Sequence, residues 1–113
     1  MNIQIFGTNK CFDTKKAQRY FKERGVRFQM IDLKEKGMSR GEFENVARAL
    51  GGWEKLVDQA AKDKQTLALL DALVGWQKED KLFENQQLFK TPIVRNGRQA
   101  TVGYQPDVWK NWE

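Results

Sequence analysis

The amino-acid sequence predicts an α/β fold in which a mixed four-stranded sheet is flanked by helices. The start of the chain has the pattern of a strand, a helix and a second strand, and its end has the pattern of two short strands and a helix. Between them, apolar residues recur at helical spacing. The 113 residues are enough for one domain, and no repeat or linker divides them.

The N-terminal strand is expected over residues 2–6, where polar and apolar residues alternate. The turn-rich loop Gly7–Lys10 follows, and a helix should begin close to Cys11 and stop near Gly25. Residues 26–33 are expected to form the second strand. Two strands joined by one helix in this way should be parallel.

The middle of the chain is expected to be helical. Residues 39–42 have the S-x-x-E pattern of a capping box. Apolar residues then repeat at helical spacing through residues 53–60 and 67–76, and a short helix is expected over 80–87. Such apolar stripes indicate core packing rather than a ligand site.

The C-terminal part is expected to return to strand. Residues 92–95 and 99–102 should pair as a hairpin, because Asn-Gly at 96–97 is a strong signal for a two-residue turn. Pro106 suits the first position of a last helix. The tryptophans lie among helical apolar faces, which favours packing over a stacking platform for nucleic acid: Trp53, Trp76, Trp109 and Trp112.

The sequence contains one cysteine and no histidine. These counts exclude an internal disulfide, a histidine general base, a Ser-His-Asp triad, a Cys-His dyad and ordinary structural zinc sites. No metal site is predicted. No apolar run approaches a membrane span, and the first ten residues lack the pattern of a signal peptide. A lone thiol of this kind is expected to stay reduced in the cytoplasm.

Positive charge is concentrated in the first part of the chain. The formal net charge is +5, but residues 1–40 contain ten Lys or Arg and only four Asp or Glu. Residues 41–113 contain ten and eleven, respectively. This basic region is interpreted as a solvated surface, as an anion-binding site around Cys11, or as a surface for an acidic partner. No nucleic-acid motif accompanies it, which disfavours RNA or DNA.

Cys11 is the candidate catalytic residue, because it lies where a strand passes into the N-terminus of a helix. Backbone amides and the helix dipole stabilise an anion there, and Lys10 and Lys15 add positive charge. We therefore expect the pKa of Cys11 to be lowered. The alternative is that Cys11 is only a small buried apolar residue. The neighbours expected to stabilise the thiolate or an incoming anion are Lys10, Thr14, Lys15 and Asn9.

Three segments together carry a family resemblance: residues 3–17, residues 32–39, and residues 91–94 with 102–104. They resemble the ArsC/Spx family of arsenate reductase-like proteins, including its YffB-like branch. The resemblance implies a thioredoxin-like (glutaredoxin-like) fold, with a core of residues 1–38 and 90–113 and a helical insertion at 39–90. It also implies a redox or nucleophilic role for Cys11. Pro92 is then expected to be cis beside the cysteine, or else trans at the start of a strand. The predicted pocket residues are Thr8, Thr91, Pro92 and Arg95.

Two departures from the family pattern bear on function. The arginines that grip arsenate in such reductases are missing at the matching positions, and Thr91 stands where an arginine precedes the proline. Lys90, Arg95 and Arg98 are possible substitutes, but lysine and arginine bind oxyanions differently, so arsenate itself is doubtful as the substrate. The chain also has Cys-x-x-Thr, so an external thiol must resolve any adduct on Cys11.

Two function hypotheses follow. The first is a thiol-dependent oxidoreductase with no bound cofactor, which acts on a small thiol, an oxyanion or a thiol-bearing protein and uses glutathione or another thiol as co-substrate. The second is a non-enzymatic Spx-like transcription regulator that contacts RNA polymerase. A family member with an unused cysteine is a third possibility. Behaviour of the Cys11→Ser variant distinguishes them.

Overall fold

A four-stranded mixed sheet forms the centre of the protein. The computed structural model describes residues 1–113, and its strand order is β2-β1-β3-β4. β1 (Ile3–Gly7) is parallel to β2 (Phe28–Asp32) and antiparallel to β3 (Ile93–Asn96), which pairs antiparallel with β4 (Gln99–Val102). The mixed sheet predicted from the sequence is confirmed.

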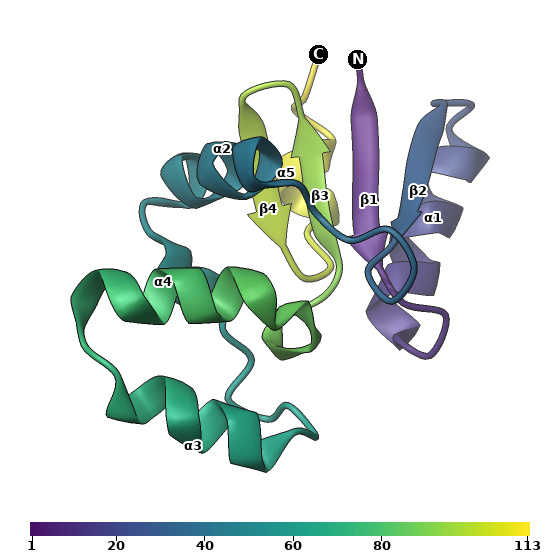
Figure 1. The fold of residues 1–113 in the computed structure, drawn as a ribbon. Coiled ribbons are helices and arrows are strands. Elements are labelled where there is room, and N and C mark those ends of the chain that lie inside the picture. The colour runs from purple at the N-terminus through teal and green to yellow at the C-terminus, as the bar shows by residue number, and fades with distance from the viewer.

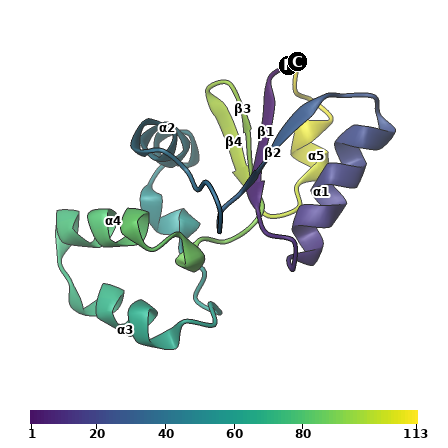
Figure 2. The ribbon, with the colours of Figure 1, turned by 45° about the vertical axis from the view of Figure 1, so that its right-hand side comes forward.

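Helices cover both faces of this sheet. α1 (Phe12–Glu23) and α5 (Pro106–Trp109) lie on one face, and α2 (Arg40–Leu50) lies on the other (Figure 1, Figure 2). The remaining helical segments extend from the α2 side, and no helix is both long and apolar enough to cross a membrane. Their bounds are η1 Trp53–Leu56, α3 Lys64–Ala72, α4 Gly75–Glu84 and η2 Gln86–Leu88.

The buried side chains form two clusters, one on each face of the sheet, because successive side chains along a strand point to opposite faces. Ile3 and Ile5 of β1 pack on the α1 and α5 side with Trp109. Phe6 points to the opposite face and packs with Phe43 of α2. Successive side chains of a strand leave opposite faces, so β1 supplies both cores. Two layers of helices therefore hold the C-terminal end of β1, where Cys11 follows, in a fixed place.

The start of α2 confirms the predicted capping box. Ser39 Oγ accepts a hydrogen bond from the Glu42 amide at 3.2 Å, and the Ser39 amide donates to Glu42 Oε1 at 2.9 Å. Two amides that the first helical turn leaves without partners are satisfied in this way. The helix ends at Gly51, whose φ of +85° is in the left-handed region that glycine favours.

The helix expected over residues 53–60 is wrong. Only the single 3-10 turn η1 forms, and Val57 then makes a β-bridge with Phe89. The Lys90 amide donates to the Leu56 carbonyl at 2.7 Å, and the Asp58 amide donates to the Leu88 carbonyl at 2.8 Å. These long-range bonds use backbone groups that a continuing helix would need, so tertiary pairing overrides the local pattern.

Two other expectations are changed in detail. The helical pattern over residues 67–76 is divided, because α3 ends at Ala72 and α4 begins at Gly75. Trp76 is consequently 72% exposed and does not pack in the core as expected. The predicted hairpin forms, but Asn96 pairs with Gln99, so the two turn residues are 97 and 98. Gly97 has the positive φ that the first turn position requires.

Candidate functional site

A cavity of about 820 Å³ opens beside Cys11, between the sheet and the helical segments after α2. The loop from β1 to α1 forms one wall with Thr8, Lys10 and Cys11, and the loop after β2 forms another with residues 33–37. Residues from 58–63 and 83–91 complete the lining. The nucleophile candidate therefore opens into a space that parts of the chain distant in sequence build together.

Cys11 occupies the N-cap position of α1. Its backbone is extended, with φ −85° and ψ 118°, and its amide donates to the Thr8 carbonyl at 3.2 Å. The side chain is half-buried, and Sγ–H donates to the Thr91 carbonyl at 3.6 Å. The thiol thus lies at the positive end of a 12-residue helix, where an anion is stabilised.

The environment of Cys11 favours the thiolate, as predicted. Partial burial raises the pKa of the Cys11 thiol, but hydrogen bonding to the Thr14 and Thr91 side chains and to the Thr14 and Asp13 amides outweighs it, so the pKa is lowered. The sequence-based expectation named the backbone amides at the start of the helix together with Lys10 and Lys15. The amides are among the causes of the lowered pKa, and the two lysines are not. Long exposed lysine side chains act through water and ions, which screen their charge.

Thr14 is only 1% exposed, and its side chain lies near enough to the Cys11 sulfur to interact with it. Its Oγ1 meets no partner at full hydrogen-bonding geometry in the resting structure, yet it lies close enough to lower the pKa of Cys11. A buried hydroxyl without a partner is costly, so the ionised sulfur is the group that can use it. Gly7 allows this arrangement, because a Cβ at Gly7 would collide with the Thr14 side chain.

The Thr91–Pro92 peptide bond is cis, which decides the question that the sequence left open. The Thr91 carbonyl accepts the hydrogen bond from Cys11 Sγ, and the Pro92 carbonyl accepts one from the Gly103 amide at 2.8 Å. Thr91 lines the cavity and the Pro92 side chain is buried behind it. The start of β3 is thereby joined to the thiol site.

The charged lining of the cavity was missed from the sequence, apart from Lys10. Lys34, Lys36 and Lys62 supply further positive charge, and four carboxylates accompany them: Glu35, Asp58, Asp63 and Glu84. None of the lysines has a carboxylate within ion-pair distance, since the two ion pairs of the structure are Arg40–Asp80 and Lys110–Asp107. The position of residues 34–36 after the second strand could have predicted that they lie near Cys11, because the carboxyl ends of parallel strands meet at one edge of a sheet.

Several predicted site residues lie outside the cavity lining. Lys15 is exposed on the outer face of α1, and Asn9 is exposed in the turn before Cys11. The prediction of Arg95 as a pocket residue is wrong. Its Nε donates to Asn45 Oδ1 at 3.1 Å and its Nη1 to Gln4 Oε1 at 2.7 Å, so it joins β1 and β3 to α2. Arg95 is three residue steps from Pro92, about 10 Å along the extended chain.

Comparison with known proteins shows which family has this sequence pattern. Residues 6–112 match the ArsC family. The chain belongs to the ArsC family. It is 26% identical to the global transcriptional regulator Spx 2 of Oceanobacillus iheyensis over 109 residues, which is 95% of this chain and 80% of that protein.

Solved structures confirm the thioredoxin-like fold. An arsenate reductase from Vibrio cholerae superposes with a TM-score of 0.80 at 22% identity, over 96% of this chain and 94% of that one. The glutaredoxin-like protein NrdH-redoxin from Escherichia coli gives a TM-score of 0.50 at 18% identity, over 100% and 96% of the two chains. The cavity of this ArsC-family chain is lined by four lysines and no arginine.

Proposed function

We propose that this ArsC-family chain is a single-cysteine thiol oxidoreductase. The observation that supports it is the half-buried Cys11 thiol, whose pKa is lowered and which opens into the cavity. The thiolate attacks one sulfur of a disulfide, forms a mixed disulfide on Cys11 and releases the other sulfur as a thiolate. An external thiolate then attacks the mixed disulfide, regenerates Cys11 and leaves with the bound group as a new disulfide.

Glutathione is the resolving thiol that we propose. It carries two carboxylates and one ammonium group, and the cavity presents lysines together with carboxylates. Lys34, Lys36 and Lys62 suit the carboxylates, and Glu84 or Asp58 suits the ammonium group. A reducing compartment such as the cytoplasm would supply such a thiol. An arsenate-reducing role is not expected, because lysines lack the rigid fork with which arginine binds an oxyanion at two points.

The test is the pH dependence of Cys11 alkylation by iodoacetamide, followed by mass spectrometry after incubation with oxidised glutathione. The expected result is a thiol that ionises below the usual value of about 8.5 and one glutathione adduct, absent from Cys11→Ser. Lys34→Glu with Lys36→Glu should slow adduct formation, whereas Arg48→Glu with Lys55→Glu on the α2 side should not. An ordinary ionisation with no adduct would refute the proposal.

A second candidate function is a Spx-like regulator that binds RNA polymerase, and the match to a global transcriptional regulator supports it. Affinity purification from a lysate of a host that encodes the protein distinguishes the two. Recovery of RNA polymerase that is unaffected by Cys11→Ser would favour the regulator. Recovery of mixed disulfides that vanish in Cys11→Ser would favour the oxidoreductase.

A further inference from the structure

The outer face of α1 carries a strongly basic surface that begins one residue after Cys11. Its exposed members are Phe12, Lys15, Lys16, Arg19, Lys22 and Glu23. The opposite side of the helix is buried in the core through Thr14, Ala17, Tyr20 and Phe21. With 3.6 residues per turn, the exposed positions form one stripe along a helix about 18 Å long. We call this stripe the α1 face.

The positive charge of the α1 face is not neutralised within the protein. The two ion pairs of the structure lie elsewhere, in Arg40–Asp80 and Lys110–Asp107. Glu23 is the only carboxylate among the exposed residues of the stripe. A solvated helix normally mixes both signs, so four cations against one carboxylate make the face complementary to an acidic surface.

Lys16 of the α1 face and Arg24 beside it are held in place by aromatic rings. Lys16 Nζ lies 5.0 Å from the centre of the Tyr104 ring, and the Arg24 guanidinium lies 3.7 Å from that of Tyr20. Arg24 also donates to the Tyr20 carbonyl at 3.1 Å. These groups, with Arg19, line a hollow of about 360 Å³ beside α1. Cations that are already ordered lose less conformational freedom when a partner binds.

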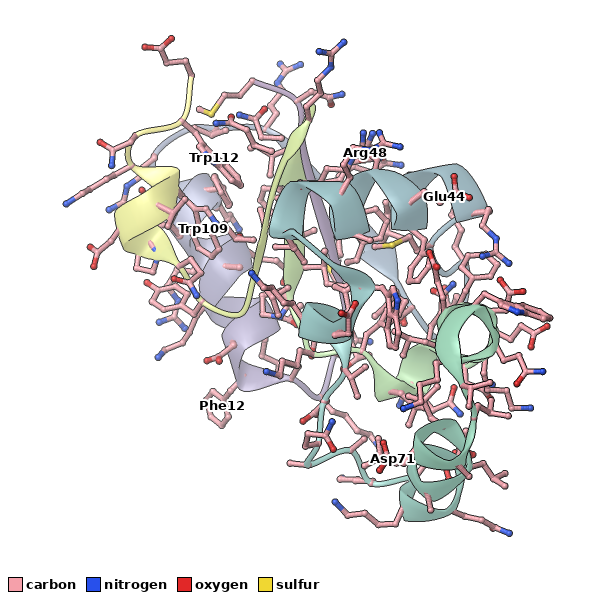
Figure 3. All side chains as sticks on the ribbon, turned by 90° about the vertical axis from the view of Figure 1, so that its left-hand side faces the viewer. Phe12, Glu44, Arg48, Asp71, Trp109 and Trp112 are labelled. Carbon is pink, nitrogen blue, oxygen red and sulfur yellow. The ribbon has the colours of Figure 1, made fainter.

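Phe12 provides an apolar contact at the end of the face nearest the thiol. Its side chain is 82% exposed and projects away from the body of the molecule (Figure 3). Arg19 lies on the same face two helical turns further along α1, and both aromatic residues and arginine are enriched in protein–protein interfaces. Nucleic acid also binds basic surfaces, but it has no sulfur to exchange with the neighbouring Cys11. The combination therefore favours a protein partner.

We propose that the α1 face docks an acidic protein surface that carries the disulfide attacked by Cys11. The proposal rests on the proposed function and adds the class of partner. The Cys11 thiolate attacks the partner's disulfide sulfur, a Cys11–partner disulfide forms, and the second sulfur leaves as a thiolate that takes up a proton. The α1 face raises the rate of encounter and orients the partner, while Thr14 and the helix N-terminus stabilise the thiolate.

The experiment uses three peptides of identical length, each with one cysteine activated as a 2-pyridyl disulfide and flanked by acidic, neutral or basic residues. Attack by Cys11 on the peptide sulfur releases pyridine-2-thione, which is followed by absorbance. We expect the acidic peptide to react about tenfold faster than the basic one at low salt, and less than about twofold faster in 0.5 M salt. The neutral small molecule 2,2′-dithiodipyridine measures the reactivity of Cys11 alone.

Two charge-reversal pairs test the surface. Arg19→Glu with Lys22→Glu should abolish or invert the preference for the acidic peptide while the rate with 2,2′-dithiodipyridine stays unchanged. Arg48→Glu with Lys55→Glu makes the same change in net charge on the α2 side of the sheet and should retain the preference. Phe12→Ser should slow the acidic and basic peptides by a similar factor, since it removes an apolar contact.

The outcomes separate the docking proposal from the proposed function. Equal rates for all peptides, or a preference that persists in the Arg19→Glu, Lys22→Glu variant, would overturn the docking proposal alone. Loss of a preference in both charge-reversal pairs would overturn it too, because net charge would then be the cause. Equal peptide rates together with tight, charge-dependent binding of a single-stranded oligonucleotide would assign the α1 face to nucleic acid. A wild-type rate with 2,2′-dithiodipyridine no higher than that of free cysteine would refute the proposed function as well.

Discussion

Thr14→Val is the substitution that most directly tests the account of the thiol site. It removes the hydroxyl near the Cys11 sulfur and retains nearly the same shape. Thr14 Oγ1 is buried and has no hydrogen-bond partner at full geometry. Its favourable interaction arises only when the sulfur is ionised, and this interaction is one of those that lower the pKa of Cys11. Reactivity and stability should therefore change in opposite senses.

The size of both effects follows from the burial of the two groups. A hydrogen bond to a charged group contributes about 1.5–3 kcal/mol, and water competes for the half-buried sulfur, so we take about 1 kcal/mol. The equilibrium between thiolate and thiol should then fall about fivefold, and the pKa of Cys11 should rise. Removing the unsatisfied hydroxyl should stabilise the thiol form by about 1 kcal/mol, within the usual cost of such a group.

Two measurements check this prediction. The rate of iodoacetamide alkylation against pH gives the ionisation of Cys11, and urea unfolding below that ionisation gives the stability of the thiol form. Thr101→Val is the matched control, because the Thr101 hydroxyl is buried but accepts a hydrogen bond from Trp109 Nε1 at 2.8 Å. Its loss should destabilise the protein by about 1–2 kcal/mol and leave the ionisation of Cys11 unchanged.

The outcome that refutes this reasoning is specific. If Thr14→Val destabilises the thiol form as much as Thr101→Val does, the Thr14 hydroxyl is satisfied in the resting protein. If alkylation of Thr14→Val follows the wild-type pH profile, that hydroxyl does not act on the sulfur. Either result would leave the backbone amides at the start of α1 as the source of the lowered pKa.

Three further predictions concern stability. Because the pKa of Cys11 is lowered in the folded state, the unfolded chain binds more protons between the folded and unfolded pKa values. The stability of wild type relative to Cys11→Ser should therefore rise with pH through that window, and this contribution should be lost as pH falls through the folded pKa. A stability difference in urea unfolding that does not change with pH would contradict it. Gly7→Ala should destabilise by about 1–3 kcal/mol, because the added Cβ collides with Thr14, and a smaller loss in the Gly7→Ala, Thr14→Ala double variant is the check. Ser39→Ala should cost about 1 kcal/mol by removing the α2 cap, and an unchanged urea midpoint would count against the capping box.

Much of the fold could be predicted because its signals are local. The strand–loop–helix that presents Cys11, the capping box at Ser39 and the hairpin at Gly97 each depend on a few adjacent residues. The helix expected over 53–60 failed for the opposite reason. Its backbone groups pair with residues 88–90, 30 or more positions away, and no local pattern contains that pairing.

The sequence by itself determined that one thiol lies at a helix N-terminus and that its pKa is lowered, because the backbone amides that act on Cys11 belong to the next three residues. Only the tertiary structure decided which charges face that thiol. The position of Arg95 on β3 brings it to Asn45 of α2, and Lys15 lies on the exposed side of α1. The segments after β2 and η1 bring Lys34, Lys36 and Lys62 to the cavity. Side-chain direction depends on packing between distant segments, and for this reason the nucleophile was predictable and its surroundings were not.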